Sequence, residues 1–327
     1  MNNIKLRAII FFIISCFIFY NFPEENYSVM YVHLGNKLPE YIYDSIVQTR
    51  LFNPKTTIYI ICYRELENKI KESLKNISNV QLIISQDLDI SKEHNHFLNV
   101  INRTDFWQFS SERFFYIEQA MKKYNLNNIF HLENDNLLYI NLGEYINIFS
   151  KKYPGIGATF DNDNRCIAGF MFIKNIESIN ALNHTFAELA EYNYNDMEIL
   201  AIFKKKNPKL IDNLPIIPGS YKTFFSLKNQ LGDFTSSSNS YSNNFELFES
   251  IFDAAALGQY LGGIDPIHRN SKPGFVNERC LFNPANFSYA WMLDKQERKV
   301  PVIIFKNQMF KINNLHIHCK NLKKFMS

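Results

Sequence analysis

The sequence predicts an α/β fold in which a mainly parallel sheet is flanked by helices and followed by a C-terminal antiparallel hairpin. From residue 27 onward, short apolar runs typical of buried strands alternate with amphipathic segments of helical period. Strands separated by helices of this length form βαβ units, in which consecutive strands lie parallel. The chain has 327 residues, of which 46% are hydrophobic and 20% charged, so it is long enough to bury a core of its own.

The first half of this region contains four predicted strands. They are residues 28–34, 56–62, 80–85 and 128–132. Predicted helices separate them, at residues 39–51, 65–74 and 105–124. Because ligands of parallel sheets bind beyond the carboxyl ends of the strands, functional residues are expected directly after these runs.

The second half is more mixed and continues the same domain, which we expect to span residues 27–327. The predicted strands are residues 156–160, 168–174, 301–306 and 309–318, and the last two form the hairpin. The predicted helices are residues 176–192, 195–206 and 247–261. Residues 226–244 are polar and of low complexity, which favours a flexible loop.

The first 26 residues have the pattern of a membrane anchor. Lys5 and Arg7 precede an apolar run at residues 8–20, and Glu24 and Glu25 follow it. A helix from residue 6 to residue 22 would be roughly 25 Å long, slightly less than a ~30 Å hydrocarbon core. The charges favour a cytoplasmic N-terminus, so we expect a single-pass type II protein whose domain lies in the lumen or outside the cytosol. A cleaved signal peptide and a buried helix are the alternatives.

The charge and the cysteines exclude two classes of function. The 35 basic and 32 acidic residues give a net charge of +3, which does not indicate the basic surface that nucleic-acid-binding proteins have. The five cysteines are scattered and form no CxxC pair, so zinc-ribbon and dithiol redox sites are excluded.

Two acidic pairs are candidate metal ligands. Glu133 and Asp135 follow the strand at residues 128–132, and side chains two apart at the end of a strand point to the same side. Carboxylate oxygens are suitable ligands for Mg²⁺ or Mn²⁺. Asp161 and Asp163 form a competing pair, ranked lower because they lie between two strands. The alternative for either pair is a solvated turn.

The C-terminal strand and one helix supply further candidates. Strand alternation places His316, His318 and Lys320 on one face, where an imidazole could complete a metal site and the ammonium could neutralise a phosphate. Asp253 precedes a helix of small residues and could act as a general base. A polar exposed strand face and a plain helix N-cap are the respective alternatives.

These features in this order resemble the nucleotide-sugar glycosyltransferases of the GT-A fold. The run FHLENDNLLY at residues 130–139 resembles the DxD motif of that superfamily, in the form Glu-Asn-Asp. Residues 168–173, AGFMFI, resemble the strand that usually follows it. Residues 195–200 resemble the start of its acceptor-side helix, and LHIHCK at residues 315–320 is similar to its terminal histidine and lysine element. The resemblance covers residues from about 28 to 320 and implies a GT-A-like domain.

The resemblance implies roles for the candidate residues. Glu133 and Asp135, with either His316 or His318, would bind Mn²⁺ or Mg²⁺, and Lys320 would bind the diphosphate of a nucleotide-sugar donor. The acceptor would be a glycan, a glycoprotein or a glycolipid.

Further roles follow from the same resemblance. Backbone groups near His33 and Gly35 would hold the nucleoside, and Arg113 would add a cation at the diphosphate. Asp253 would be the base of an inverting reaction, and residues 226–244 would close over the site. The first DxD acid is Glu, which alters the reach toward a metal but not the charge. The terminal element lacks the glycine and Pro-Trp of retaining galactosyltransferases, so either terminal histidine could be the ligand. Phe252 and Asp253 match the base motif of inverting members only loosely, so inverting and retaining reactions both stay open.

Two functions of other classes remain as alternatives. One is a non-catalytic GT-A-like membrane protein that binds a glycan or a partner. The other is a metal-dependent phosphoesterase, which would use a carboxylate-rich two-metal cluster. Its ligands would be Glu133, Asp135, Asp161, Asp163, His316 and His318.

Overall fold

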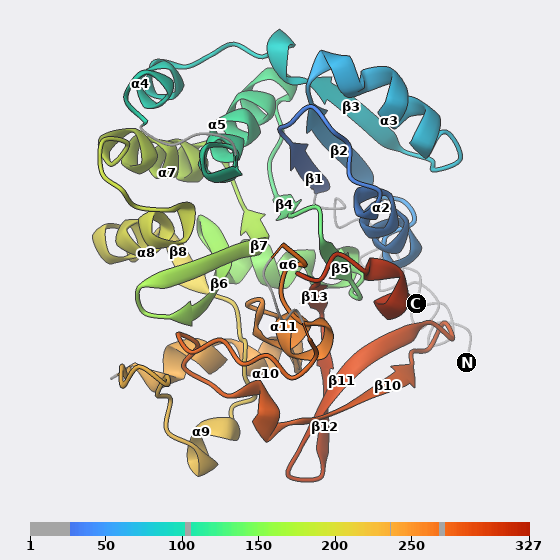
Figure 1. Cartoon of the computed structure of the whole chain (residues 1–327), viewed down its shortest axis with the longest axis vertical. Coiled ribbons are helices and arrows are strands. Elements are labelled where there is room, and N and C mark those ends of the chain that lie inside the picture. The colour runs from blue at the N-terminus through green and yellow to red at the C-terminus, as the bar shows by residue number, and fades with distance from the viewer. Residues whose placement is uncertain (1–26, 102–105, 236, 268–271) are drawn as a thin grey trace, which may run out of the picture.

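The computed structural model describes residues 27–101, 106–235, 237–267 and 272–327. The predicted anchor, residues 1–26, lies outside these residues. None of the helices in the described ranges is long and apolar enough to cross a membrane. Figure 1 shows a large sheet with helices on both faces and a smaller sheet beside it.

The large sheet has seven strands in the order β3-β2-β1-β4-β7-β6-β8. Its strands are β1 (Ser28–His33), β2 (Thr57–Cys62), β3 (Val80–Ile84), β4 (Ile129–Leu132), β6 (Ile156–Asn162), β7 (Arg165–Ile173) and β8 (Ile211–Asn213). Among these seven strands, β7 alone runs antiparallel to its neighbours β4 and β6. This mixed α/β arrangement confirms the predicted mainly parallel sheet.

Helices cover the two faces of the large sheet, and six of them are named here. They are α2 (Tyr41–Phe52), α3 (Glu67–Leu74), α5 (Phe106–Tyr124), α6 (Leu142–Lys152), α7 (Ile176–Glu188) and α8 (Asp196–Lys206). In β1, Val29 and Tyr31 pack in a cluster with residues of α2, α3 and α6, whereas Met30 and Val32 pack in a second cluster with residues of α5, α7 and α8. Strand alternation thus buries both faces of β1, which explains why its sequence is apolar throughout.

Two smaller sheets follow the large one. Four strands, in the order β10-β11-β12-β9, form the first. These are β9 (Ser250–Ile251), β10 (Ser288–Leu293), β11 (Lys299–Phe305) and β12 (Gln308–Ile312). The second pairs β13 (Asn314–His316) with β5 (Asn136–Leu138). The predicted hairpin is therefore present as β11 and β12. Its second strand was predicted to continue to residue 318, but β12 ends at Ile312, and the following strand, β13, pairs with β5 in another sheet.

The structure corrects the prediction at several places. The expected helix at residues 247–261 is wrong, because the chain forms α10 (Phe245–Phe248), then β9, then α11 (Ala256–Gly262). Ala255 has a φ of +62°, a left-handed conformation that interrupts the helical path. The elements missing from the prediction include α4 (Lys92–Val100), α6 and β10. Within residues 226–244, the structure has a 3₁₀ helix at Ser238–Ser242.

Candidate functional site

The acidic pair lies in a turn directly after β4, near the middle of the large sheet. β4 ends at Leu132, and the turn from Glu133 to Asp135 leads into β5. In the sheet, β1 has β2 on one side and β4 on the other, so the order of strands reverses between β1 and β4. Ligands of open α/β sheets bind beyond the carboxyl ends of the strands at such a reversal. The turn therefore lies where a ligand is expected.

Strand β13 brings His316 to this turn. It pairs with β5 directly after Asp135, near α11 in the centre of Figure 1. Two glycines allow the close approach. A Cβ atom at Gly169 would lie 2.5 Å from Nδ1 of His316, and a Cβ atom at Gly258 would lie 2.0 Å from its carbonyl oxygen. Any larger side chain at either position would have to displace β13.

His316 bridges the two acids of the turn. Its Nε2 lies 2.9 Å from Oε2 of Glu133 and 3.1 Å from Oδ1 of Asp135. Burial alone would lower the pKa of His316, but the two carboxylates outweigh burial and raise it to about 10. Burial would likewise raise the pKa of each carboxyl group, but the neighbouring cations lower both. The three side chains therefore form one charged cluster with little access to water.

Lys320 stands at one end of this cluster. Its ammonium pairs with Asp135 and lies 3.9 Å from Oδ2 of Asp265. The ammonium also lies 5.4 Å from the centre of the Tyr41 ring, within the range of a cation–π contact. Burial opposes its charge, yet Asp135 raises the pKa of Lys320 above the ordinary value. A fixed cation therefore lies beside the acidic turn, as the sequence predicts.

Arg113 stands at the other end. It projects from α5, pairs with Glu133 and lies 2.8 Å from Oδ2 of Asp196, the first residue of α8. The guanidinium is held between two carboxylates, which raise the pKa of Arg113 even though burial opposes its charge. Burial raises the pKa of Asp196 to about 6, although Arg113 lowers it. The side chains of the site thus alternate in charge, and we call them the charged row. In order, they are Lys320, Asp135, His316, Glu133, Arg113 and Asp196.

Three of the predicted ligands could hold a metal ion together. Asp135, His316 and His318 each offer one ligand atom, and these atoms lie within 4.8 Å of one another. Nδ1 of His316 and Nε2 of His318 are buried without a hydrogen-bond partner. Burial and the charge of His316 lower the pKa of His318 to about 3, so its imidazole is neutral, whereas His316, with its raised pKa, would give up its proton on binding an ion. One carboxylate and two imidazoles fit Mn²⁺ better than Mg²⁺, which prefers oxygen ligands.

Glu133 differs from the other predicted ligands. Its carboxylate faces Arg113 and His316, and it is not in the group with metal-ligating geometry. The structure therefore gathers both terminal histidines around Asp135 and turns Glu133 toward Arg113.

The end of β1 joins the same site. His33 is the last residue of β1, and its Nδ1 lies 3.2 Å from Nδ2 of Asn134 in the acidic turn. Its Nε2 lies 2.9 Å from the carbonyl oxygen of Lys37, so the ring fixes the loop that follows β1. Gly35 in that loop has a φ of +152°, which favours glycine. Oδ1 of Asn134 is buried without a hydrogen-bond partner, so this oxygen is available to accept a hydrogen bond from a ligand.

Asp253 lies close to His316 but is engaged by the backbone. Its Oδ1 accepts from the Leu257 amide at 2.9 Å, and its Oδ2 accepts from the amides of Gly258 at 2.9 Å and His316 at 3.0 Å. The residue has no exposed surface. Burial raises the pKa of Asp253, and the three amides oppose this shift. This geometry favours a structural role, fastening α11 to β13, over the predicted role of general base.

The competing acidic pair lies elsewhere. Asp161 is buried and pairs with Arg165, and Asp163 accepts hydrogen bonds from Tyr241 at 2.5 Å and Thr235 at 3.2 Å. Over the described ranges, neither acid belongs to a group that could hold a metal ion. The carboxylate-rich cluster that a two-metal phosphoesterase needs is therefore not assembled from these residues.

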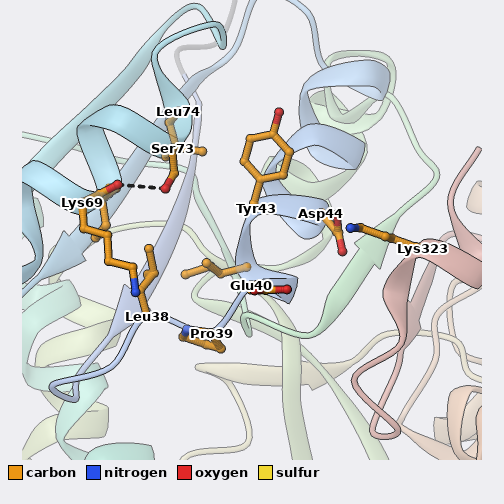
Figure 2. Close-up of a pocket in the computed structure, with 11 residues that line it drawn as sticks. Leu38, Pro39, Glu40, Tyr43, Asp44, Lys69, Ser73, Leu74 and Lys323 are labelled. Atoms are coloured by element: carbon orange, nitrogen blue, oxygen red, sulfur yellow. Dashed lines mark hydrogen bonds between the residues drawn. The ribbon is translucent and has the colours of Figure 1, made fainter.

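Two grooves of about 380 Å³ each lie outside the charged row. The first, shown in Figure 2, lies between α2 and α3 and is lined by Glu40, Tyr43, Asp44 and Lys323 above an apolar floor. Tyr41 points the other way, toward Lys320. The second groove runs along α8.

The second groove is polar. Its lining comes from α8, from the turn between β6 and β7 and from two loops. It includes Asn162, Arg165, Tyr194, Glu198, Lys205, Asn229 and Arg279. Asp196, which pairs with Arg113, and Glu198, which lines the groove, belong to the same first turn of α8 but leave the helix on different sides.

Several residues of the site were missing from the sequence-based prediction. They are Tyr41, Asn134, Asp196 and Asp265. Asp196 had a usable signal, because Asn195 and Glu198 form a capping box that places it in the first turn of α8. The others depend on contacts between distant segments and carry no local signal.

Comparison with known proteins gives only distant similarities. No protein-family model and no curated protein matches the chain. An active-site mutant of LgtC is 12% identical, with a TM-score of 0.42 over 66% of this chain and 83% of that chain. The PaToxG glycosyltransferase is 15% identical, with a TM-score of 0.41 over 56% of this chain and 70% of that chain. A cytidylyltransferase from Leptospira borgpetersenii is 9% identical, with a TM-score of 0.38 over 58% of this chain and 76% of that chain. At these scores the fold rests on the strand order and register described above.

Proposed function

We propose that the protein is a metal-dependent glycosyltransferase that moves a sugar from a nucleotide-sugar donor to a hydroxyl group of a glycan, glycoprotein or glycolipid. One observation carries the proposal. Asp135, His316 and His318 form a metal-ligating group at the carboxyl end of β4, with the ammonium of Lys320 on the same carboxylate. This combination suits a diphosphate, and it agrees with the sequence motifs at residues 130–139 and 315–320.

The proposed chemistry is the stabilisation of a leaving nucleoside diphosphate. A divalent ion held by Asp135, His316 and His318 would act as a Lewis acid on the phosphate oxygens. Lys320 supplies a second positive charge, which Asp135 and Asp265 hold in place before the reaction. Because Lys320 is partly buried and held by two carboxylates, its ammonium stabilises developing negative charge more strongly than the same group in water.

Arg113 supplies a third positive charge at the opposite end. Asp196 and Glu133 hold its guanidinium from two sides, so Asp196 acts as a positioning residue in this proposal. The buried, alternating charges restrict the guanidinium to one orientation, which is the condition for recognising a charged or polyhydroxylated substrate.

The nucleoside is proposed to lie against the loop after β1. His33 ties this loop to Asn134 of the acidic turn, and the strained backbone of Gly35 leaves the space beside the ring open. The second substrate, the acceptor, is assigned to the groove along α8, the helix whose first residue, Asp196, pairs with Arg113. Its Arg279, Tyr194 and asparagine side chains offer the polar groups and the aromatic face that sugar hydroxyls and rings contact.

The apolar segment at residues 8–20 is proposed to anchor the protein as a single-pass type II membrane protein. Its support is the sequence pattern alone, with basic residues before the segment and acidic residues after it.

The test is donor hydrolysis by the purified chain with a panel of nucleotide sugars and Mn²⁺. Hydrolysis that selects one donor and stops on chelation of the metal supports the proposal. The variant Asp135→Asn is expected to lose this activity, whereas Asp89→Asn, a change at an exposed acid, keeps it. Cleavage of simple phosphoesters instead points to a phosphoesterase, and no turnover with any donor points to a non-catalytic binding protein. Either result contradicts the proposal.

A further inference from the structure

Strand β10 exposes apolar side chains at the edge of the smaller sheet. Trp291 is 39% exposed, Met292 41% and Leu293 61%. β10 pairs with β11 only, so its outer edge has no partner strand among the described residues. Edge strands of soluble proteins usually carry charges or proline that prevent association. Because side chains alternate along a strand, Trp291 and Leu293 share one face of the ribbon and Met292 lies on the other. An exposed tryptophan and leucine on one face of an edge strand indicate a surface that is covered by something else.

A third apolar side chain lies beside this surface. Leu51, near the end of α2, is 42% exposed, and its carbonyl oxygen accepts a hydrogen bond from Nη1 of Arg298 at 3.1 Å. Arg298 lies in the turn between β10 and β11, so Leu51 is adjacent to this ribbon. We call Leu51, Trp291 and Leu293 the ribbon patch. Figure 1 shows the β10–β11 ribbon running from β12 toward the side of the molecule where α2 lies.

The residues that flank the ribbon patch are predominantly basic. In residues 50–55 and 291–299 there are five basic residues and two acidic ones. The basic residues are Arg50, Lys55, Lys295, Arg298 and Lys299. One of the two acids, Asp294, is already paired with Arg298. The ammonium of Lys299 lies 5.5 Å from the centre of the Trp291 ring, so charge and aromatic surface are presented together.

The ribbon patch lies on the side of the large sheet where the described chain begins. Tyr27 precedes β1, and its hydroxyl accepts a hydrogen bond from Thr56, in the loop between α2 and β2, at 2.9 Å. Leu51 lies just before the same loop. This is the amino end of β1 and β2, whereas the charged row lies at the carboxyl end of β4. The 26 residues that precede Tyr27 contain the apolar segment at residues 8–20.

We propose that the ribbon patch rests on the surface of an anionic phospholipid bilayer. Tryptophan is enriched at the interface of membranes, and basic residues near an anionic surface each contribute a modest attraction. The apolar segment at residues 8–20, proposed above as the anchor, would hold the domain near a bilayer, and the basic aromatic patch would then decide which side of the domain faces the lipid. In this orientation the charged row faces away from the bilayer. The proposal does not depend on glycosyl transfer.

The chain contains two tryptophans, which make the test specific. Trp107 is 44% exposed, in the first turn of α5 on the side of the charged row, and Trp291 is in the ribbon patch. The variant Trp107→Phe reports on Trp291 alone, and Trp291→Phe reports on Trp107 alone. Each full-length variant is reconstituted in phosphatidylcholine vesicles with and without phosphatidylglycerol, and the lipids are then replaced by brominated lipids, which quench nearby tryptophan.

We expect brominated lipids to reduce the emission of Trp291 and to leave that of Trp107 nearly unchanged. In Trp107→Phe, the further change of Lys295 and Lys299 to glutamate should reduce the quenching, as should raising the salt concentration. Equal quenching of both tryptophans, or none of Trp291, overturns the proposal, as does a chain that does not bind vesicles. A concentration-dependent blue shift of Trp291 in the absence of lipid, without quenching in its presence, would assign the patch to a second copy of the chain instead.

Discussion

The variant Asp253→Asn separates a structural role of this buried acid from the role of a general base. The carboxylate accepts three backbone hydrogen bonds, from the amides of Leu257, Gly258 and His316. An asparagine side chain has one oxygen, so at least one of these amides would face an NH₂ group. The change therefore removes one or two hydrogen bonds to a charged acceptor and leaves buried donors unsatisfied.

The expected cost follows from these contacts. Hydrogen bonds to charged groups contribute about 1.5–3 kcal/mol each, so the free energy of unfolding should fall by about 2–5 kcal/mol. For a domain of this size that corresponds to a fall in Tm of roughly 3–8 °C. The activity should decrease as well, since β13 carries His316 and would lose one of its attachments to α11.

The assay is thermal unfolding followed by circular dichroism, with donor hydrolysis measured on the same samples. Asp89→Asn, at an exposed position, is the matched control and should change stability by less than about 0.5 kcal/mol. If Asp253→Asn unfolds at the temperature of the unmodified protein, keeps donor hydrolysis and loses only transfer to the acceptor, the structural role is refuted and the general base is restored.

Three further predictions concern the rest of the site. Gly169→Ala places a methyl group against His316, which should weaken Mn²⁺ binding measured by titration, whereas Gly219→Ala, with its nearest contact at 3.6 Å, should not. Asp196 has a pKa raised to about 6, so its ionisation destabilises the folded state as pH rises from about 4 to 6. The difference in the free energy of unfolding between Asp196→Asn and the unmodified protein should therefore change in favour of the variant by up to about 3 kcal/mol between about pH 4 and pH 6. A difference that stays the same over this pH interval would contradict the prediction. Arg279→Ala should raise the KM for the acceptor and leave donor hydrolysis unchanged. An unchanged KM for the acceptor together with slower donor hydrolysis would contradict the proposal that the acceptor binds in the groove along α8.

The parts of the fold that depend on local sequence pattern were predictable. β1 to β4 are short apolar runs, and their helices have a clear period, so the order of these elements could be derived residue by residue. The acids Glu133 and Asp135 were found because they follow a strand, and His316 was found because it alternates with apolar residues. The sequence-based site and the charged row share these residues for that reason.

The parts that depend on distant contacts were not predictable. Asp253 looked like the exposed head of a long helix, but the left-handed Ala255 shortens that helix, and β13, some sixty residues later, covers the carboxylate. Glu133 looked like a metal ligand, but Arg113 of α5 takes up its carboxylate. In both cases the sequence shows the charged group and its local element, and the partner that determines its role comes from another part of the chain.

The central claim is that Asp135, His316 and His318 bind a divalent ion together with a nucleoside diphosphate. The most direct measurement is the loss of the free Mn²⁺ signal in electron paramagnetic resonance as protein is added, with and without uridine diphosphate as a probe. The account predicts one Mn²⁺ site per chain that tightens with the diphosphate and is lost in Asp135→Asn. Equal Mn²⁺ binding by the unmodified protein and by Asp135→Asn would contradict it.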